Sequence, residues 1–544
     1  MPATTTDFVQ LKTWLEGGKK ANIIKALETL QAYLIQQGDA RAARERVQTL
    51  TTNIPIQSFL PCFDTKSLEQ LQLIVFVFGK IMEETDVNQA LLVDPIVGQF
   101  LAQGYKHPFE IVRRLTINQV ARCTLQTLMA NPELFLDILY SGMLDPEISV
   151  EKVAVKIITN IASTLDGIDA IFYKHKALLV DKLLGELPKS GNEINRFRVY
   201  ELMTTLCGLS QEAFDAVSNI GLFKLFNNDF KNSKDDILSI LNFLEIFKAL
   251  CLQSFKKQGA NSLKEEGSFD LLMAILNDNQ EDQLTYTFIL NLIADISDAA
   301  ENLFFGEESK LSVPPSIILK LFNEDLSNTF NKESQIVAIS VIGALCKSSV
   351  KNLDFILLGD EEKLSKYLVF YADSINDQIA QAFYHSLGSI LESPRIDDER
   401  AEKIVNVLES MLKKRIEPSI TKPSNSYIMN YAMYNLRAPF SDVRCAIYHF
   451  LKGLCSRINL VKNHVNAHSE FFDYIIDRNT EPNKETKEWK FNTIEVLHKT
   501  IQTHPHASGV DAKHIINLKT YLLRGAYIGD KKEVQAIVAT ESFE

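Results

Sequence analysis

The sequence has few of the features that mark secreted, membrane or metal-binding proteins. Its seven cysteines form no CxxC pair, which favours reduced thiols over disulfides. The most apolar run, Leu71 to Phe78, is far shorter than the roughly twenty residues of a membrane span. The segment from Met1 to Trp14 is too polar for a signal peptide. We therefore expect a soluble protein of the cytoplasm, and possible residence in the nucleus as well.

Positive charge is also in deficit. Lysine and arginine total 57 against 69 aspartates and glutamates, so the net charge at pH 7 is −12. Proteins that bind nucleic acid need a basic footprint for the phosphates, so this balance disfavours nucleic acid as the main ligand. Apolar residues make up 46% and charged residues 23% of the chain, which is the composition of a folded protein.

Motifs for catalysis are missing as well. His464 and His468 have the spacing of a zinc-binding pair but lack the glutamate of HExxH, so we expect a solvated pair on one helix. Gly17-Gly18-Lys19 lacks the spacing and the hydroxyl of a phosphate loop and predicts a helix break. No nucleophile, base and orienting group stand together in a recognised motif. The sequence thus predicts no metal, no cofactor and no enzymatic activity.

One helical pattern does recur along the chain. Successive copies start 38 to 52 residues apart, with one interval of 64. These intervals bracket the period of roughly 40–47 residues in HEAT and armadillo repeats. The residues three, five and eight positions after each start are apolar, apart from Thr205 and Thr287. An acidic residue precedes each start by at most four positions, as at a helix amino terminus. The apolar starts are Val112, Val150, Phe197, Leu238, Leu284, Ile336, Ile379 and Val443.

The pattern predicts an all-α solenoid of armadillo/HEAT-type repeats wound as a right-handed superhelix. Several of the repeated helices end in Leu-Cys, and we interpret Cys207, Cys251, Cys346 and Cys455 as buried small apolar residues. Glycines such as Gly221 and Gly267 precede apolar segments and predict breaks between helices.

The same pattern divides the chain into five segments. Residues 1–105 form degenerate helical repeats, with helices expected at Ile23 to Ile35 and Leu68 to Met82. Three prolines predict a long loop insertion over residues 417–441, which explains the longest interval. The repeats therefore cover residues 106–416 and 442–528, and residues 529–544 are expected to form a frayed acidic tail.

Several segments resemble the proteasome non-ATPase regulatory subunit 5 family. They follow one another in the family's order and are Arg196 to Leu202, Pro439-Phe440 leading into Cys445-Ala446, Phe471 to Arg478, and Leu518 to Leu522 followed by Gly525 and Tyr527.

The resemblance implies a chaperone that assembles the proteasome regulatory particle. Such a protein binds the carboxy-terminal domain of an AAA+ ATPase subunit of the base, and its partners extend to a large non-ATPase base subunit. The pattern of repeats by itself implies only a protein-binding solenoid. The alternative is a general armadillo adaptor or nuclear transport receptor. Such receptors line their groove with recurring tryptophans, whereas the two tryptophans here, Trp14 and Trp489, are predicted to lie outside the recurring helices that start at Val112 to Val443.

If the recurring helix is the third helix of an armadillo repeat, residues two, six and ten positions after its start should face a groove. One end of this groove would be cationic and its middle apolar, so that the cations attract an acidic edge of the partner and the apolar side chains bury its apolar surface. The predicted partner-binding residues are Arg114, Arg122, Lys152, Lys156, Met203, Leu244, Tyr286 and Leu290.

Overall fold

The computed structural model is built from helices, and no β-strand occurs among the residues that it describes. Those are residues 5–37, 39–93, 95–188, 192–233, 236–278, 282–297, 315–328, 331–372, 377–416, 426–468, 470–505 and 507–527. They fall into two compact units. The first unit holds residues 1–232 and 253–262, and the second holds residues 233–252 and 263–544. The all-helical fold class is thereby confirmed for the described residues.

The first unit begins with helices that the sequence pattern places correctly, at α2 and α4. Its elements are α1 (Thr5–Glu16), α2 (Lys20–Leu34), α3 (Ala40–Asn53), η1 (Ile56–Phe63), α4 (Leu68–Glu84), α5 (Val87–Val93), α6 (Pro95–Gly104), α7 (Glu110–Val120), α8 (Leu125–Ala130), α9 (Pro132–Met143), α10 (Ile148–Ala162), α11 (Leu165–Ile168), η2 (Asp169–Lys174), η3 (Lys176–Leu178), α12 (Val180–Leu184), α13 (Glu193–Cys207), α14 (Gln211–Asn219), α15 (Leu222–Asn232) and η4 (Phe255–Lys257).

The second unit continues the same alternation of short and long helices. Its elements are α16 (Ile237–Gln253), α17 (Gly259–Glu265), α18 (Ser268–Asp278), α19 (Gln283–Ile296), α21 (Pro315–Lys320), η5 (Leu321–Asp325), α22 (Lys332–Ser348), α23 (Val350–Leu353), η6 (Asp354–Leu358), α24 (Glu361–Leu368), η7 (Val369–Ala372), α25 (Asp377–Glu392), α26 (Asp398–Ile416), α27 (Tyr427–Asn435), α28 (Ser441–Cys455), α29 (Ile458–Leu460), η9 (Val461–Val465), α30 (Phe471–Ile476), α31 (Lys484–Thr503) and α32 (Ala512–Arg524).

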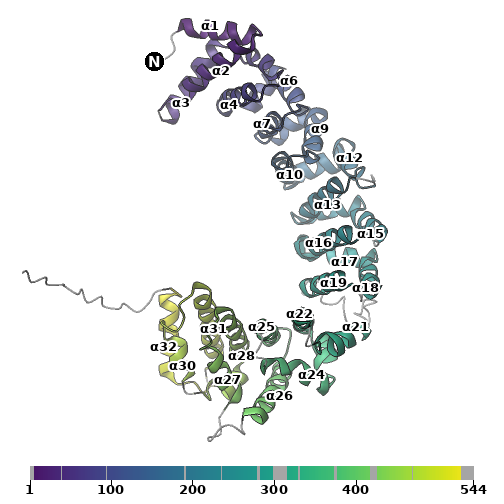
Figure 1. The fold of residues 1–544 in the computed structure, drawn as a ribbon, viewed down its shortest axis with the longest axis vertical. Coiled ribbons are helices and arrows are strands. Elements are labelled where there is room, and N and C mark those ends of the chain that lie inside the picture. Colours follow the sequence, from purple (N-terminus) through teal and green to yellow (C-terminus); the bar gives the residue numbers. More distant parts are fainter. Residues whose placement is uncertain are drawn as a thin grey trace, which may run out of the picture. The chain divides into compact units, whose positions relative to one another are not determined.

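Each repeat consists of a short helix, a middle helix and a long helix. In the first unit α11 with η2, α12 and α13 form such a set, and in the second unit α29 with η9, α30 and α31 form another. The long helices stack on one another, α4, α7, α10 and α13 in the first unit and α19, α22, α25, α28 and α31 in the second (Figure 1). Three helices per repeat, ending in the long one, is the armadillo arrangement that the sequence pattern predicts.

The helix boundaries follow the predicted signals. Asp282 is the N-cap of α19, and its carboxylate accepts a hydrogen bond from the Leu284 amide. Gly221 and Gly267 have φ angles of +83° and +79°, a conformation that glycine adopts at little cost, and the next helix starts directly after each. The four cysteines at or near the ends of long helices are buried, as expected.

Two long helices of the second unit approach closely because glycines face their neighbours' backbones. A Cβ atom added at Gly388 of α25 would lie 2.7 Å from the His449 carbonyl oxygen of α28. One added at Gly453 of α28 would lie 2.8 Å from the Gly388 carbonyl oxygen. Only glycine therefore allows this packing distance between α25 and α28.

The structure corrects the predicted loop insertion over residues 417–441. Helix α27 lies within this range, and its Tyr427, Ile428 and Met429 side chains are buried. Its amino terminus is held by Glu409 of α26, whose carboxylate accepts hydrogen bonds from the amides of Tyr427 and Ile428. Residues 417–425 and the predicted tail from residue 529 lie outside the described residues.

Within the described residues no single helix is both long and apolar enough to span a membrane, although α16 and the segment Phe255–Glu265, bent by 100°, pass that test together.

A largely buried arginine joins successive repeats in the first unit. Arg113 of α7 makes two hydrogen bonds of 2.6 and 2.9 Å to the Asp145 carboxylate, which precedes α10. Its Nη1 also donates to the carbonyl oxygens of His107 and Pro108, each at 2.9 Å. We call this arrangement the first arginine clasp. A bidentate, charge-assisted pair of this kind fixes both position and orientation.

The second unit contains the same device. Arg444 of α28 donates to the Glu481 carboxylate at 2.9 Å and to the carbonyl oxygens of Ala438 and Pro439 at 2.7 and 3.1 Å. Both clasps arise from a Pro-Phe-x-x-Val-Arg sequence that meets an acid-Pro pair ahead of the next long helix. Tyr448 also donates to Glu481, at 2.8 Å, so both carboxylate oxygens of this buried glutamate accept a hydrogen bond in the second arginine clasp.

The first clasp predicts different outcomes for two adjacent arginines. Arg113→Ala should destabilise the first unit by roughly 3 kcal/mol, because it leaves the Asp145 carboxylate buried without its cation. Arg114→Ala should change stability by less than about 0.5 kcal/mol, because the side chain is exposed. Hydrogen exchange measured by mass spectrometry over α7 and α10, together with thermal unfolding, would test this. Equal effects of the two substitutions would contradict the role of the clasp.

Candidate partner-binding surface

Three cations line the exposed face of α7 and α10 in the first unit. Arg114 projects from α7, Lys152 and Lys156 project one turn apart from α10, and all three are exposed. The two helices pack against each other, and the cations stand two or six residues after the buried starts Val112 and Val150, which are equivalent positions in successive repeats. Asn118 and Asn160, also predicted to face the groove, are exposed as well. We call this surface the cationic face.

The cations of this face are available to a partner. Among the described residues, none of Arg114, Lys152 and Lys156 has an ion-pair or hydrogen-bond partner for its side chain. Glu151 stands next to Lys152 in α10, and Glu201 belongs to α13. Burial together with the charge of Glu151 raises the pKa of Glu201. Whether the cationic face binds a partner stays a prediction.

Arg122 has a different environment from the one predicted. Its guanidinium donates to the carbonyl oxygens of Met82, Glu83 and Thr85 at the carboxyl end of α4, the last of these at 2.9 Å. The Met82 carbonyl also accepts a hydrogen bond from the Thr85 amide. The last carbonyls of a helix lack the amide one turn further on, so the arginine caps α4. The prediction that Arg122 serves a partner is corrected, because its donors are used inside the chain.

The apolar half of the predicted site is also corrected. Met203, Leu244, Tyr286 and Leu290 are between 1% and 3% exposed, and each packs inside the repeats. Tyr286 in addition donates to the Asp325 carboxylate at 3.2 Å. Side chains buried to this degree cannot contact a partner while the repeats remain folded.

The error in α16 and α19 is one of register. The predicted helix starts Leu238 and Leu284 are 71% and 51% exposed, and the buried stripe begins two residues later, at Ile240 and Tyr286. A shift of two residues turns an α-helix by about 200°, which exchanges its buried and exposed faces. The spacing of Ile240, Phe243, Leu244 and Phe247 was the available signal, because it follows the i, i+3, i+4, i+7 rule.

Exposed apolar side chains therefore lie where the sequence reasoning did not place them. Leu238 of α16 and Leu284 and Phe288 of α19 are all at least 40% exposed. The two helices are neighbours in the second unit, joined by an ion pair of 2.6 Å between Lys248 and Asp295. Leu238, Leu284 and Phe288 form what we call the apolar face.

The described residues offer no group of three or more His, Cys, Asp or Glu side chains arranged to hold a metal ion. The expectation that His464 and His468 form a solvated pair is wrong for His464. That side chain is buried, and its Nδ1 lies 3.3 Å from the Ser426 hydroxyl and 3.9 Å from the Glu409 carboxylate. It belongs to the packing between α26, α27 and the η9 segment.

Comparison with known proteins identifies the chain's relatives. The family described as proteasome non-ATPase 26S subunit matches residues 11–542. The chain belongs to this family. It is 23% identical over 520 residues to the bovine 26S proteasome non-ATPase regulatory subunit 5, covering 93% of this chain and 94% of that protein. It is 22% identical over 473 residues to the human protein of the same name, covering 85% of each.

Among solved structures the chain is similar to one described as Kap95p binding to RanGDP. The TM-score is 0.49 and the identity 15%, with 94% of this chain and 62% of that chain covered. A crystal structure of importin β has the same TM-score and identity, with 92% and 66% covered.

Two of the segments that resemble the proteasome subunit family, Phe471 to Arg478 and Leu518 to Gly525, contact each other in the second unit. Arg478 donates to the carbonyl oxygens of Tyr521 and Gly525, each at 2.7 Å, so it ties one family segment to the next. Lys490 of α31 donates to the Asp477 carbonyl oxygen and the Thr480 hydroxyl at 2.5 and 2.6 Å. Burial lowers the pKa of Lys490 to about 8. These segments thus hold the last repeats together.

Tyrosine–carboxylate pairs recur in both units, as the pair of Tyr286 with Asp325 shows. Tyr200 donates to Asp229 at 2.7 Å and Tyr140 to Glu186 at 2.6 Å. Burial and the adjacent carboxylate raise the pKa of Tyr200 and Tyr286, and they raise that of Tyr140 to about 12.

These tyrosines predict a loss of stability at alkaline pH. Above a pH of about 10 the tyrosines of the unfolded chain ionise, whereas the paired tyrosines of the folded chain stay neutral. The unfolded state then binds fewer protons, so the free energy of unfolding falls as the pH rises through that range. The phenolate absorbance of these tyrosines should therefore appear together with the loss of helical circular dichroism.

Tyr200→Phe should remove one tyrosine from the group that ionises only when the chain unfolds. Tyr434→Phe, at a side chain that is 75% exposed, should leave that group unchanged. A single reversible titration of all tyrosines without unfolding would contradict the prediction.

Proposed function

We propose that this chain is a non-catalytic chaperone that binds an ATPase subunit of the proteasome base, through the carboxy-terminal domain of that subunit, while the regulatory particle assembles. The family match over residues 11–542 carries the proposal, because it extends over nearly the whole chain. The curated relatives are themselves proteasome non-ATPase regulatory subunits. A large non-ATPase subunit of the base is a further proposed partner.

The surfaces described above support a binding role. Arg114, Lys152 and Lys156 form an unpaired cationic patch on a chain of net charge −12, so an acidic edge of a partner would find its complement there. The apolar face on α16 and α19 offers area that a partner could bury. Family and fold both favour a protein without catalytic activity.

The alternative of a nuclear transport receptor has less support. Trp489 belongs to α31, a further long helix of the stack, which the prediction did not count among the recurring helices. Its indole ring lies 4.9 Å from the His449 ring and 5.8 Å from the His385 ring, centroid to centroid, so it takes part in the stacking of α25, α28 and α31. Trp489 is the one tryptophan on the long helices of the repeats, so the recurring tryptophans of import receptors are absent from those helices as far as the structure describes them.

Purified chain mixed with each recombinant ATPase subunit of the base tests the proposal directly. We expect a stoichiometric complex with one subunit, and we expect the isolated carboxy-terminal domain of that subunit to bind as well. The chain alone should not hydrolyse nucleotide. Affinity purification from cell extract should recover the same subunit. Recovery of import cargo without proteasome base subunits would instead favour the transport receptor.

Charge reversal on the cationic face should slow association. Lys152→Glu with Lys156→Glu should lower the association rate by roughly tenfold at low salt and flatten its dependence on salt, because these charges steer the encounter. The same reversal at Lys224 and Lys231, exposed on α15, is the matched control and should have little effect. Binding kinetics over a series of salt concentrations would decide. If the control pair slows binding as much, the cationic face is not the site.

A further inference from the structure

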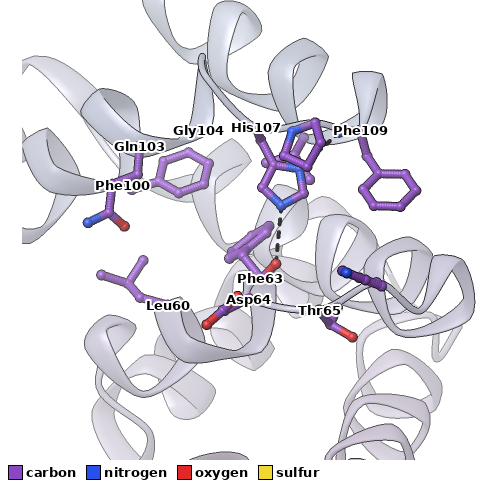
Figure 2. A pocket seen from close by; sticks show the side chains of 12 residues that line it. Leu60, Phe63, Asp64, Thr65, Phe100, Gln103, Gly104, His107 and Phe109 are labelled. Carbon is purple, nitrogen blue, oxygen red and sulfur yellow. Dashed lines mark hydrogen bonds between the residues drawn. The ribbon is translucent and has the colours of Figure 1, made fainter.

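A cleft of about 550 Å³ lies in the first unit, beside the loop that the first arginine clasp holds (Figure 2). It opens between the end of η1, the last turns of α6 and the loop that enters α7. Its volume is within the range of small-ligand sites in proteins. None of the residues predicted to bind a partner lines it.

The floor of the cleft is aromatic and rigid. Phe63 and Phe100 are 7% and 4% exposed, and their ring centroids are 5.4 Å apart. Phe78, fully buried behind them, lies 5.4 Å from the Phe63 ring and 4.6 Å from the Phe100 ring. Leu60 and Phe109 extend the apolar surface toward the solvent and remain half-exposed. Rings packed in this way present a fixed apolar surface.

Hydrogen bonds of His107 brace the wall of the cleft. Its Nδ1 accepts a bond of 3.2 Å from the Phe109 amide, so the ring proton resides on Nε2, which donates to the Phe63 carbonyl oxygen at 3.2 Å. Figure 2 shows the bond from the ring to Phe63 across the cleft. Arg113 holds the same loop from the other side through the carbonyls of His107 and Pro108. A cavity braced from both sides stays open without a ligand, which lowers the cost of binding one.

The second arginine clasp provides an internal comparison. There the position of His107 is occupied by Ala438, yet Arg444 still binds the carbonyls of Ala438 and Pro439. The clasp therefore does not need a histidine at this position. Phe440, which corresponds to Phe109, is 57% exposed. The two extra bonds of His107 thus serve the wall of the cleft and not the clasp.

The rim of the cleft carries an acidic, a basic and an amide side chain. Asp64, Lys66 and Gln103 are exposed there, and within the described residues their side chains make no hydrogen bond or ion pair. The rim carries one charge of each sign, so an anion or a cation is attracted by one of these side chains and repelled by the other, and its charge gives it no net advantage. A neutral group that both donates and accepts hydrogen bonds suits all three, and the amides of a peptide main chain have this property.

We propose that this cleft binds one aromatic side chain of an extended peptide segment from a partner protein. The ring lies on Phe63 and Phe100 beside Leu60 and Phe109, and the amides on either side of it bond to Asp64, Lys66 and Gln103. This site is independent of the ATPase contact proposed above, because it uses other residues and needs no particular partner.

The test uses the full chain and a neutral probe, N-acetyl-phenylalaninamide, followed by saturation-transfer NMR. We expect saturation of the ring protons of this probe and none for N-acetyl-alaninamide. N-acetyl-phenylalanine, an anion, and phenethylamine, a cation, should bind more weakly than the neutral amide. Equal signals from the alanine and phenylalanine amides, or the tightest binding from a charged probe, would overturn the proposal.

Variants locate the site. Phe109→Ala should weaken probe binding by roughly fivefold or more, because it removes one wall of ring contacts. Gln103→Trp should block the cleft from its exposed rim without disturbing the core. Phe440→Ala, in the second clasp, is the matched control and should bind the probe like the parent. All three should keep the parent's circular dichroism and thermal midpoint.

His107→Ala tests whether the histidine supports the cleft or the fold of the first unit. Because Ala438 supports the second clasp, this variant should keep the protection of α7 and α10 in hydrogen exchange while the probe binds more weakly. If Phe109→Ala, Gln103→Trp and His107→Ala all bind the probe like the parent, the cleft is not a peptide site.

Discussion

The repeats depend on one contact that occurs in each unit: an arginine binds the acidic residue ahead of the next long helix. Arg113 and Arg444 are largely buried, and each satisfies a carboxylate and two backbone carbonyls at once. A repeat in a solenoid cannot bury its apolar face alone and needs its neighbour in a definite orientation. Apolar packing provides the stability, and it tolerates small rotations. The directional hydrogen bonds from each guanidinium to a carboxylate and two carbonyl oxygens do not, so the clasps set how one long helix follows another.

Pairing with carboxylates also distinguishes the polar side chains inside the repeats from those on the surface. Tyr200, Tyr286 and Arg444 inside the repeats are each paired with a carboxylate, which offsets the cost of burying them. On the exposed face of α7 and α10, Arg114, Lys152 and Lys156 lack such partners. Neighbouring residues in the sequence, Arg113 and Arg114, therefore have opposite roles, one holding repeats together and the other facing solvent.

Sequence reasoning predicted the helical repeats and the cationic face because both follow from local pattern. Val112 and Val150 are true buried starts, so the residues two positions after them, Arg114 and Lys152, are exposed as expected. Leu238 and Leu284 misled the pattern because a helix can begin with an exposed leucine, whereas the i, i+3, i+4, i+7 spacing that starts at Ile240 marks the side chains that face inward in α16. The prolines of residues 417–441 likewise suggested a loop, whereas Glu409, remote in sequence, caps a buried helix there. The cleft could not be predicted, since Phe63, Phe100 and His107 come together only in the folded chain.

Asp145 has one further consequence for how the first unit deforms. Its carboxylate is held by Arg113 of α7, while its carbonyl oxygen accepts a 2.6 Å bond from Arg198 of α13. A single residue ahead of α10 is thus fastened to the helix on either side. When a load pulls on one of these three helices, the strain passes through Asp145 to the other two. The segment from α7 to α13 should therefore yield as one mechanical element and open cooperatively, instead of peeling away one helix at a time.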